Sequence, residues 1–344
     1  MTGLCASTIF DRHQRPLRDL RISVIDRCNL RCPYCMPAEK FGDSYKFLKH
    51  SEWLQFDEII RLGTIFHSLG VNKFRLTGGE PLLRPDLADL VKGLSDIDSK
   101  ADVALTTNGL WLAEQIGELK RAGLKRLTVS LDSLNKDIYH RMTGGRAHVR
   151  RVLDGIREAE AVGMTNIKIN AVVQKGINDR CVMDLVEYFR PTGHVVRFIE
   201  FMDVGNQNGW KLERVVPGRD IIKMIHERYP LEVVEGPHSA ETARRYRFRD
   251  GMGEIGIICS VTEPFCTDCT RMRLSADGKI YTCLFSSAGT DLRALLRGGV
   301  SDDELTRHIR AVWGRRADRY SEDRRKVSSG GASSPKIEMF YIGG

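Results

Sequence analysis

The chain contains 344 residues, of which 42% are hydrophobic and 28% are charged, as in ordinary soluble globular proteins. It has no run of 18 or more apolar residues, which excludes a membrane-spanning helix, and residues 1–10 lack the basic and apolar segments of a secretory signal. The formal net charge of +8 is compatible with nucleic acid, with a polyanionic small substrate, or with a basic surface that binds nothing.

Strand and helix patterns alternate from about residue 18 to residue 200. The expected strands are 20–25, 73–76, 103–105, 126–129, 167–173 and 195–198, and the expected helices include 51–69, 86–94, 112–122, 147–162 and 181–189. This alternation predicts βαβ units and a parallel sheet. Six units favour an α/β fold, an incomplete (β/α)6 TIM-like barrel, although periodicity alone does not separate it from a flat doubly wound sheet.

The alternation stops after residue 202. A helix is expected at 218–229, antiparallel strands and loops around 259–283, and a charged helical stretch at 302–326. Residues 328–335 have the composition of a flexible linker, and the apolar run 337–342 precedes a Gly343–Gly344 terminus. We therefore divide the chain into a barrel core, 1–216, and a C-terminal α+β segment, 217–344.

The nine cysteines indicate metal binding rather than disulfides, because their number is odd and six of them form two tight groups. This usage predicts a reducing, cytoplasmic environment. The first triad, Cys28, Cys32 and Cys35, directly follows the first strand and can hold three irons of a [4Fe–4S] cluster, leaving the fourth iron open for a small molecule. Zinc is the alternative, but structural zinc needs four ligands and the nearest downstream histidine is His50.

The second triad, Cys266, Cys269 and Cys283, would again leave one iron of a cluster open, and it encloses the segment Arg-Met-Arg at 271–273. Cys259 lies seven residues before Cys266. Four cysteines could therefore close a structural zinc site or a saturated cluster for electron transfer. The residues alone leave this choice open.

Short polar or glycine-containing segments follow five of the expected strands, at the end where the functional residues of parallel barrels gather. They are 77–81 (Thr-Gly-Gly-Glu-Pro), 106–109, 130–133, 174–176 and 200–202. Each alone is typical of an ordinary turn or helix cap. Five in register with the strands favour a site at that end of the barrel.

Residues 28–37, Cys-Asn-Leu-Arg-Cys-Pro-Tyr-Cys-Met-Pro, resemble the cluster loop of the radical S-adenosylmethionine (SAM) superfamily. The pattern C-x2-C-x-R-x-R with a third cysteine and a Gly-Gly terminus resembles the GTP 3′,8-cyclase family of molybdenum cofactor biosynthesis, over residues 11–344. The resemblance implies a partial barrel of the radical SAM type, two [4Fe–4S] clusters, and SAM as cofactor. It also implies a lyase that converts GTP to (8S)-3′,8-cyclo-7,8-dihydroguanosine 5′-triphosphate with SAM and a reductant.

The same resemblance assigns roles position by position, with the two triads as cluster ligands and without Cys259. The implied SAM contacts are Tyr34, Gly79, Ser130 and Met202. The implied GTP contacts are Arg21, Arg75, Thr106, Lys168, Arg271, Met272 and Arg273, and the residues implied in catalysis are Arg271, Arg273, Gly343 and Gly344. Because the basic residues come from well-separated segments, we expect a barrel to bring them together at one mouth. We also expect the Gly-Gly terminus to thread back into that mouth.

The resemblance implies three partners, a flavodoxin- or ferredoxin-type electron donor, a cyclic pyranopterin monophosphate synthase that receives the product, and a second copy in a homodimer. No membrane and no nucleic acid are expected. The sequence departs from the family pattern at His13–Gln14, where an aromatic–glycine pair is usual, and at Ile25, where threonine is common. The alternatives are a radical SAM enzyme that modifies a peptide and a zinc-containing nucleic-acid-binding protein.

Overall fold

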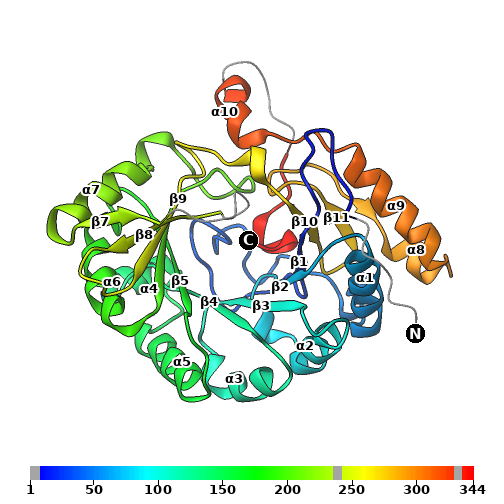
Figure 1. Cartoon of the computed structure of the whole chain (residues 1–344), viewed down its shortest axis with the longest axis horizontal. Coiled ribbons are helices and arrows are strands. Elements are labelled where there is room, and N and C mark those ends of the chain that lie inside the picture. The colour runs from blue at the N-terminus through cyan, green and yellow to red at the C-terminus, as the bar shows by residue number, and fades with distance from the viewer. Residues whose placement is uncertain (1–7, 235–241, 329–334) are drawn as a thin grey trace.

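The computed structural model describes residues 8–234, 242–328 and 335–344. Its strands form one 12-stranded sheet in the order β12-β11-β10-β1-β2-β3-β4-β5-β6-β9-β8-β7. Figure 1 shows this sheet curving around a central space, with helices along its outer side. Within the described residues the end strands β12 and β7 do not pair with each other. The predicted incomplete barrel is therefore confirmed, and the alternative of a flat doubly wound sheet is wrong.

Six parallel strands form the centre of the sheet, as the alternation predicts. They are β1 (Asp19–Ser23), β2 (Lys73–Thr77), β3 (Asp102–Thr107), β4 (Arg126–Ser130), β5 (Lys168–Val173) and β6 (Val195–Glu200). In β5 and β6 half-buried residues alternate with buried ones. One face of these strands therefore packs against the helices, and the other faces an interior that solvent reaches.

The helices that follow these strands lie outside the barrel. They are α1 (Phe56–Ser68), α2 (Leu87–Ser95), α3 (Leu112–Arg121), α4 (Lys136–Met142), α5 (Val149–Ala161), α6 (Val182–Phe189) and α7 (Gly218–Arg228). Each longer helix buries one stripe of residues, and in α5 the stripe is Val152, Gly155, Ile156 and Ala159. The sequence did not predict the short helix α4, which Asn135 caps by accepting two backbone N–H groups of its first turn, at 3.0 and 3.1 Å.

The C-terminal segment extends the sheet at both edges. It contributes β7 (Leu231–Val233), β8 (Arg244–Phe248), β9 (Glu254–Ile258), β10 (Arg271–Leu274), β11 (Lys279–Tyr281) and β12 (Thr290–Asp291). The predicted antiparallel pairing is present within β7–β9 and within β10–β12. The sequence did not predict that β9 would pair in parallel with β6, and β10 in parallel with β1. The boundary at 216/217 stays a prediction.

The remaining helices of the described residues are α8 (Arg293–Arg297), α9 (Asp302–Gly314), α10 (Tyr320–Ser328) and α11 (Met339–Ile342). Two helices, α9 and α10, thus replace the single helical stretch predicted at 302–326. Short 3-10 helices occur at His50–Glu52, Pro81–Leu83, Asp179–Cys181, Arg190–Thr192, Leu212–Arg214 and Cys266–Asp268. Most of the predicted linker, 328–335, and all of residues 1–7 lie outside the described residues. Among the described helices, none combines the length and hydrophobicity needed to cross a lipid bilayer.

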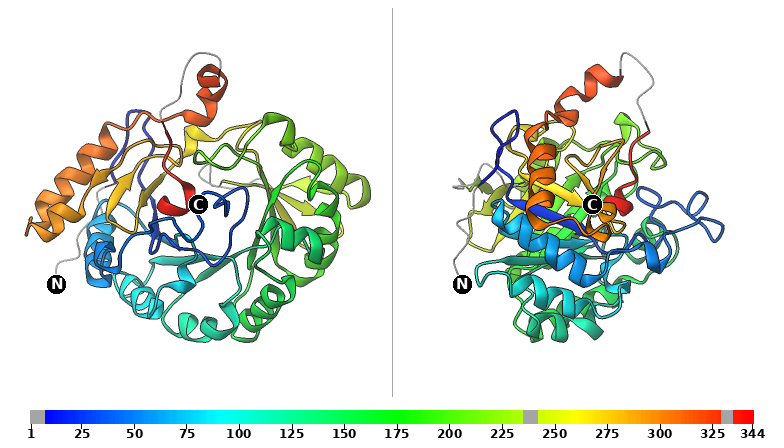
Figure 2. Two further views of the ribbon diagram at one scale, coloured as in Figure 1. Left: turned by 180° about the vertical axis from the view of Figure 1, so that it is seen from behind. Right: turned by 90° about the vertical axis from the view of Figure 1, so that its right-hand side faces the viewer.

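The C-terminal tail returns into the barrel. In Figure 1 and in the left view of Figure 2, the C-terminus lies within the curve of the sheet. Phe340 of α11 packs with Met36 and Phe41 in a small buried cluster, with the Phe340 and Phe41 ring centroids 4.9 Å apart. Met36 adjoins the last cysteine of the first triad, so the tail is anchored beside that triad.

Gln14 adopts a left-handed backbone conformation, with φ of 60°. It lies in the turn between Phe10 and Pro16, which form an isolated bridge ahead of β1. This is the position where the resembling family usually has glycine, which adopts such angles without a steric penalty. The departure therefore places strain in one surface turn and leaves the barrel itself unchanged.

We predict that Gln14→Gly will stabilise the protein by about 0.5–1 kcal/mol, because relief of the left-handed strain exceeds the entropy that glycine adds to the unfolded chain. The thermal midpoint of unfolding should rise by a few degrees. Arg12→Gly, an exposed neighbour without positive φ, is the matched control and should lower the midpoint. An equal decrease in both variants would contradict the assignment of strain.

Candidate active site

One cavity of about 1180 Å³ occupies the interior of the barrel. The residues assigned from the sequence that line it are Arg21, Cys28, Cys32, Tyr34, Cys35, Arg75, Gly79, Thr106, Ser130, Lys168, Met202, Cys266, Cys269, Arg271, Arg273, Cys283 and Gly344. Two assigned residues, Met272 and Gly343, do not line it. Segments far apart in the chain thus open on a single space.

The two triads lie toward opposite ends of the strands. Cys28 follows the carboxyl end of β1, whereas Cys269 precedes β10, whose register places Arg271 beside Asp19 at the amino end of β1. The N–H groups of Arg18 and Asp19 donate to the Thr270 carbonyl at 3.1 and 3.2 Å. The basic residues expected at one mouth all line this cavity, and they lie along its strands, because parallel pairing of β10 places Arg271 and Arg273 beside Asp19 and Arg21.

The loop of the first triad is shaped by a buried arginine. Arg31 donates from Nη1 to the carbonyl oxygens of Cys28 and Leu30, at 2.7 and 2.8 Å, and from Nε to that of Phe41 at 2.7 Å. Burial raises the pKa of the Cys28 thiol to about 12 and also raises the pKa values of Cys32 and Cys35. A metal that binds these thiols would displace their protons.

The segment 77–81 forms a tight turn against the first triad's loop. The Gly79 N–H donates to the Ile25 carbonyl at 2.8 Å, and a Cβ on Gly79 would lie 2.1 Å from the Arg27 carbonyl oxygen. Only glycine allows this approach. Buried Glu80 holds the next strand's loop, because its carboxylate accepts from the Thr107 hydroxyl at 2.6 Å and the Asn108 N–H at 2.7 Å.

Tyr34, between the second and third cysteines, is oriented by a neighbouring strand. Its hydroxyl donates to Oδ2 of Asp132 at 2.6 Å, and Oδ1 of Asp132 accepts from the Val172 N–H at 2.8 Å. Burial raises the pKa of Asp132 to about 6. One carboxylate thereby connects the loops after β1 and β4 with strand β5.

Cationic side chains line the middle of the cavity. Arg21, Arg75 and Lys168 project from inside the strands rather than from the loops that follow them. The structure adds further cations that the sequence reasoning missed, among them Lys73, Arg126 and Arg197. The alternation of side chains along a strand could have predicted Lys73, because Lys73 and Arg75 share one face of β2. A TIM barrel usually fills this space with apolar side chains.

Two of these cations, Arg21 and Lys168, lie in surroundings that favour the binding of an anionic ligand. Nε of Arg21 is buried and has no hydrogen-bond partner within the residues that the structure describes. Burial, together with Arg197, Arg126, Arg75 and Lys73, lowers the pKa of Lys168 to about 7. A bound polyanion would supply the missing acceptor and reverse the mutual repulsion.

The second triad lies in a cationic environment. Arg271 donates from Nη2 to the Cys269 sulfur at 3.3 Å. Although burial raises the pKa of Cys269, Arg271 and Arg316 outweigh burial and lower it to about 6. Arg273, on the same face of β10, donates from Nη1 to the carbonyl of Gly343 in the tail.

Met272 requires a correction. Its side chain is fully buried in the hydrophobic core, on the face of β10 opposite Arg271 and Arg273. Successive strand residues point to opposite faces, so the Met272 side chain does not reach a ligand in the cavity. Cys259 is likewise buried, beside Gly218, and does not line the cavity. The four-cysteine alternative therefore loses its fourth ligand.

The cysteines of both triads are free to bind a metal group. All six triad cysteines carry free thiols. In the part of the chain that the structure describes, no group of three or more His, Cys, Asp or Glu side chains could hold one metal ion. A zinc ion would need its sulfur ligands within about 2.3 Å of the metal.

Comparisons with known proteins agree with this geometry. The family model described as "Radical SAM superfamily" matches residues 22–189. The family model described as "Molybdenum Cofactor Synthesis C" matches residues 194–322. A protein of Xanthomonas axonopodis pv. citri named GTP 3′,8-cyclase is 50% identical, over 97% of this chain and 98% of that protein. One of Staphylococcus aureus with the same name is 45% identical over 98% and 99%.

Solved structures share the fold at low identity. Streptococcus suis SuiB, bound to its precursor peptide SuiA, has a TM-score of 0.61 at 16% identity, over 87% of this chain and 68% of that one. Methylornithine synthase (PylB) has a TM-score of 0.51 at 14% identity, over 91% and 86%. Both superpositions extend past the six-stranded centre of the sheet. Similarity over nearly the whole chain to proteins of that name, together with the cavity and its two cysteine triads, shows that the chain belongs to the GTP 3′,8-cyclase family of the radical SAM superfamily.

Proposed function

We propose that the chain is a lyase that cyclises GTP to (8S)-3′,8-cyclo-7,8-dihydroguanosine 5′-triphosphate, the first step of molybdenum cofactor biosynthesis. The observation that carries the proposal is one cavity with a cysteine triad toward each end and cationic side chains between them. Relatives at 45–50% identity that bear the GTP 3′,8-cyclase name support it. The likeness to SuiB concerns the fold alone and does not favour a peptide substrate.

Cys28, Cys32 and Cys35 would hold three irons of the first [4Fe–4S] cluster, whose fourth iron would take SAM. When bound and reduced, the cluster and SAM would supply the radical chemistry that removes a hydrogen atom from the GTP ribose and allows C3′ to bond to C8. The chain's own part is to hold SAM. Tyr34, Gly79, Ser130 and Met202 line the cavity for this purpose, and Gly79 lets the backbone approach closely.

The triphosphate would lie among the cations of the central cavity. Arg21, Arg75 and Lys168 come from three different strands and line one space. A hydrogen bond to a charged group contributes about 1.5–3 kcal/mol, so three to five such bonds are enough for micromolar affinity after ordering costs. Thr106, which accepts from Arg75 Nη1 at 3.0 Å, fixes one of these guanidinium groups.

Cys266, Cys269 and Cys283 would hold a second [4Fe–4S] cluster with one iron open to the guanine. Arg271 and Arg273 lie beside this end of the cavity and would stabilise negative charge that develops during the final electron and proton uptake. Arg273 also connects this end to the tail through the Gly343 carbonyl. Gly344, at the cavity wall, is placed to restrict the position of the nucleotide ribose.

The remaining features of the proposal concern partners and location, and they rest on the family and the sequence. The electron donor is a flavodoxin or ferredoxin, and the product passes to a cyclic pyranopterin monophosphate synthase. The chain forms a homodimer in the cytoplasm, and it binds neither membrane nor nucleic acid.

The central test compares two cysteine variants after anaerobic reconstitution. The unmodified chain should bind about eight iron atoms and, with GTP, SAM and dithionite, yield 5′-deoxyadenosine and the cyclised nucleotide. Cys283→Ala should bind about four and lose nucleotide cyclisation while SAM cleavage persists. Cys259→Ala, the matched buried control, should keep both centres. Loss of the second centre in Cys259→Ala instead would support a four-cysteine site and contradict the proposal.

GTP affinity should depend on the charge of Lys168. Its pKa of about 7 in the free protein rises when a phosphate binds, so the attraction is complete below pH 7 and decreases as the pH increases above it. Affinity should fall by up to about tenfold per pH unit between the free and bound pKa values. Calorimetry without reductant, from pH 7 to 9, measures this slope. Lys168→Met should abolish the pH dependence of GTP affinity, and Lys168→Arg should move it to higher pH. An unchanged pH dependence in Lys168→Met would show that another group causes it.

The tail should tolerate substitution unequally. Gly343 has φ of 76°, and a Cβ there would lie 2.3 Å from Cγ2 of Thr77, whereas a Cβ on Gly344 would meet the flexible Met339 side chain at 2.9 Å. Gly343→Ala should therefore displace the tail and lower the cyclisation rate by about 100-fold. Gly344→Ala should cost less than tenfold. Equal rates for both variants in a product assay would show that tail geometry does not matter.

A further inference from the structure

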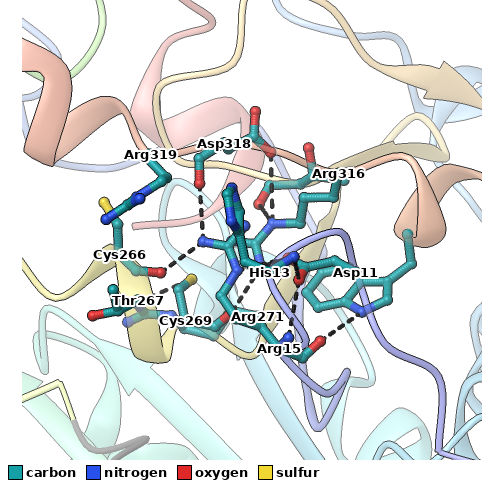
Figure 3. A network of polar contacts seen from close by, with 12 residues as sticks. Asp11, His13, Arg15, Cys266, Thr267, Cys269, Arg271, Arg316, Asp318 and Arg319 are labelled. Atoms are coloured by element: carbon teal, nitrogen blue, oxygen red, sulfur yellow. Dashed lines mark hydrogen bonds and ion pairs between the residues drawn. The ribbon is translucent and has the colours of Figure 1, made fainter.

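A buried ion network lies behind the second triad (Figure 3). Asp11 and Arg15 come from the turn before β1, and Arg316 comes from the end of α9. The side chains of Arg15 and Arg316 are each 2% exposed, and that of Asp11 is fully buried. Burying two guanidinium groups costs free energy unless their N–H groups donate hydrogen bonds. The acceptors of these hydrogen bonds therefore indicate what the two arginines hold in place.

Arg316 connects the two halves of the second triad. Its Nη1 donates to the Cys269 carbonyl at 2.7 Å, and its Nε donates to the Thr282 carbonyl at 3.1 Å. Thr282 directly precedes Cys283, which is separated from Cys269 by 13 residues of sequence. One planar guanidinium therefore bridges the two ligand-bearing segments at the open end of the antiparallel pair β10–β11.

Arg15 performs the same task for the first cysteine of the triad. Its Nη1 donates to the Cys266 carbonyl at 2.6 Å and to the Asp318 carbonyl at 2.9 Å. Asp11 joins the two arginines, because its Oδ2 accepts from Arg15 Nε at 2.6 Å and from Arg316 Nη1 at 3.1 Å. The N-terminal turn is thereby tied to all three cysteine positions.

The second triad needs such support because its loop has little regular structure. Between β9 and β10 the regular backbone is the 3-10 helix Cys266–Asp268. Backbone carbonyls outside strands and helices require other donors, and the two arginines supply them. The first triad uses a similar arrangement, in which Arg31 binds the Cys28 carbonyl.

We propose that Arg15 and Arg316, held by Asp11, are positioning residues that fix the spacing of the three thiols of the second triad for cluster binding. This inference rests on the proposed function, which assigns a cluster to that triad. The arginines act through backbone carbonyls, and their forked geometry matters more than their charge.

The test compares four variants of the full chain, isolated anaerobically: Arg15→Gln, Arg316→Gln, Arg316→Lys and Arg84→Gln. Arg84 is the matched control, because it is 5% exposed and donates to the carbonyls of Val24 and Leu54 without contacting a triad. Iron per chain and electron paramagnetic resonance spectra of reduced protein, with SAM or with GTP, are measured.

Both glutamine variants should fall from about eight toward about four iron atoms per chain, losing the GTP-induced spectral change and keeping the SAM-induced one. Arg316→Lys keeps the charge but reaches only one carbonyl, so it should recover less than half of the lost iron. Arg84→Gln should reduce the iron content of both centres equally, or of neither. Glutamine variants with about eight irons and an intact GTP response would overturn the inference. If the unmodified chain held only about four irons, the proposed second cluster itself would be wrong.

Discussion

The parallel pairing of β10 with β1 is the constraint on which the site depends. It brings residues 271–274 of the C-terminal segment into register with residues 19–22, so that Arg273 lies beside Arg21 and Arg271 beside Asp19. The first triad follows the carboxyl end of β1, and the second triad surrounds the amino end of β10. One set of backbone hydrogen bonds thus places two triads at either end of a single cavity.

The interior of this barrel is polar where such barrels are usually packed with branched apolar residues. Side chains that point inward from β1, β2 and β5 include Arg21, Arg75 and Lys168, and burial lowers the pKa of Lys168 to about 7. Placing like charges together costs stability, which a polyanionic ligand restores on binding. The carboxyl groups of Glu80 and Asp132 act on the first triad, whereas Arg271 and Arg316 act on Cys269 of the second. The two ends of the cavity therefore differ in electrostatic character.

Much of this arrangement could be predicted from the sequence, because local patterns determine it. The six parallel strands, the helices that cover them and the two cysteine triads follow from periodicity and spacing. The pairing of β9 and β10 with the edges of the core could not be predicted, because it depends on contacts between distant segments. The position of Met272 in the core follows from the same pairing. The role of Arg316 was hidden for that reason too, since a charged residue after a helix usually lies in solvent.

The account requires the ribose of GTP to lie beside SAM while its base faces the second triad. Deuterium placed at C3′ of GTP tests this requirement directly, with 5′-deoxyadenosine analysed by mass spectrometry after reaction with SAM and dithionite. We expect one deuterium atom to be transferred to 5′-deoxyadenosine. Formation of 5′-deoxyadenosine without deuterium, alongside consumption of the labelled nucleotide, would contradict the account.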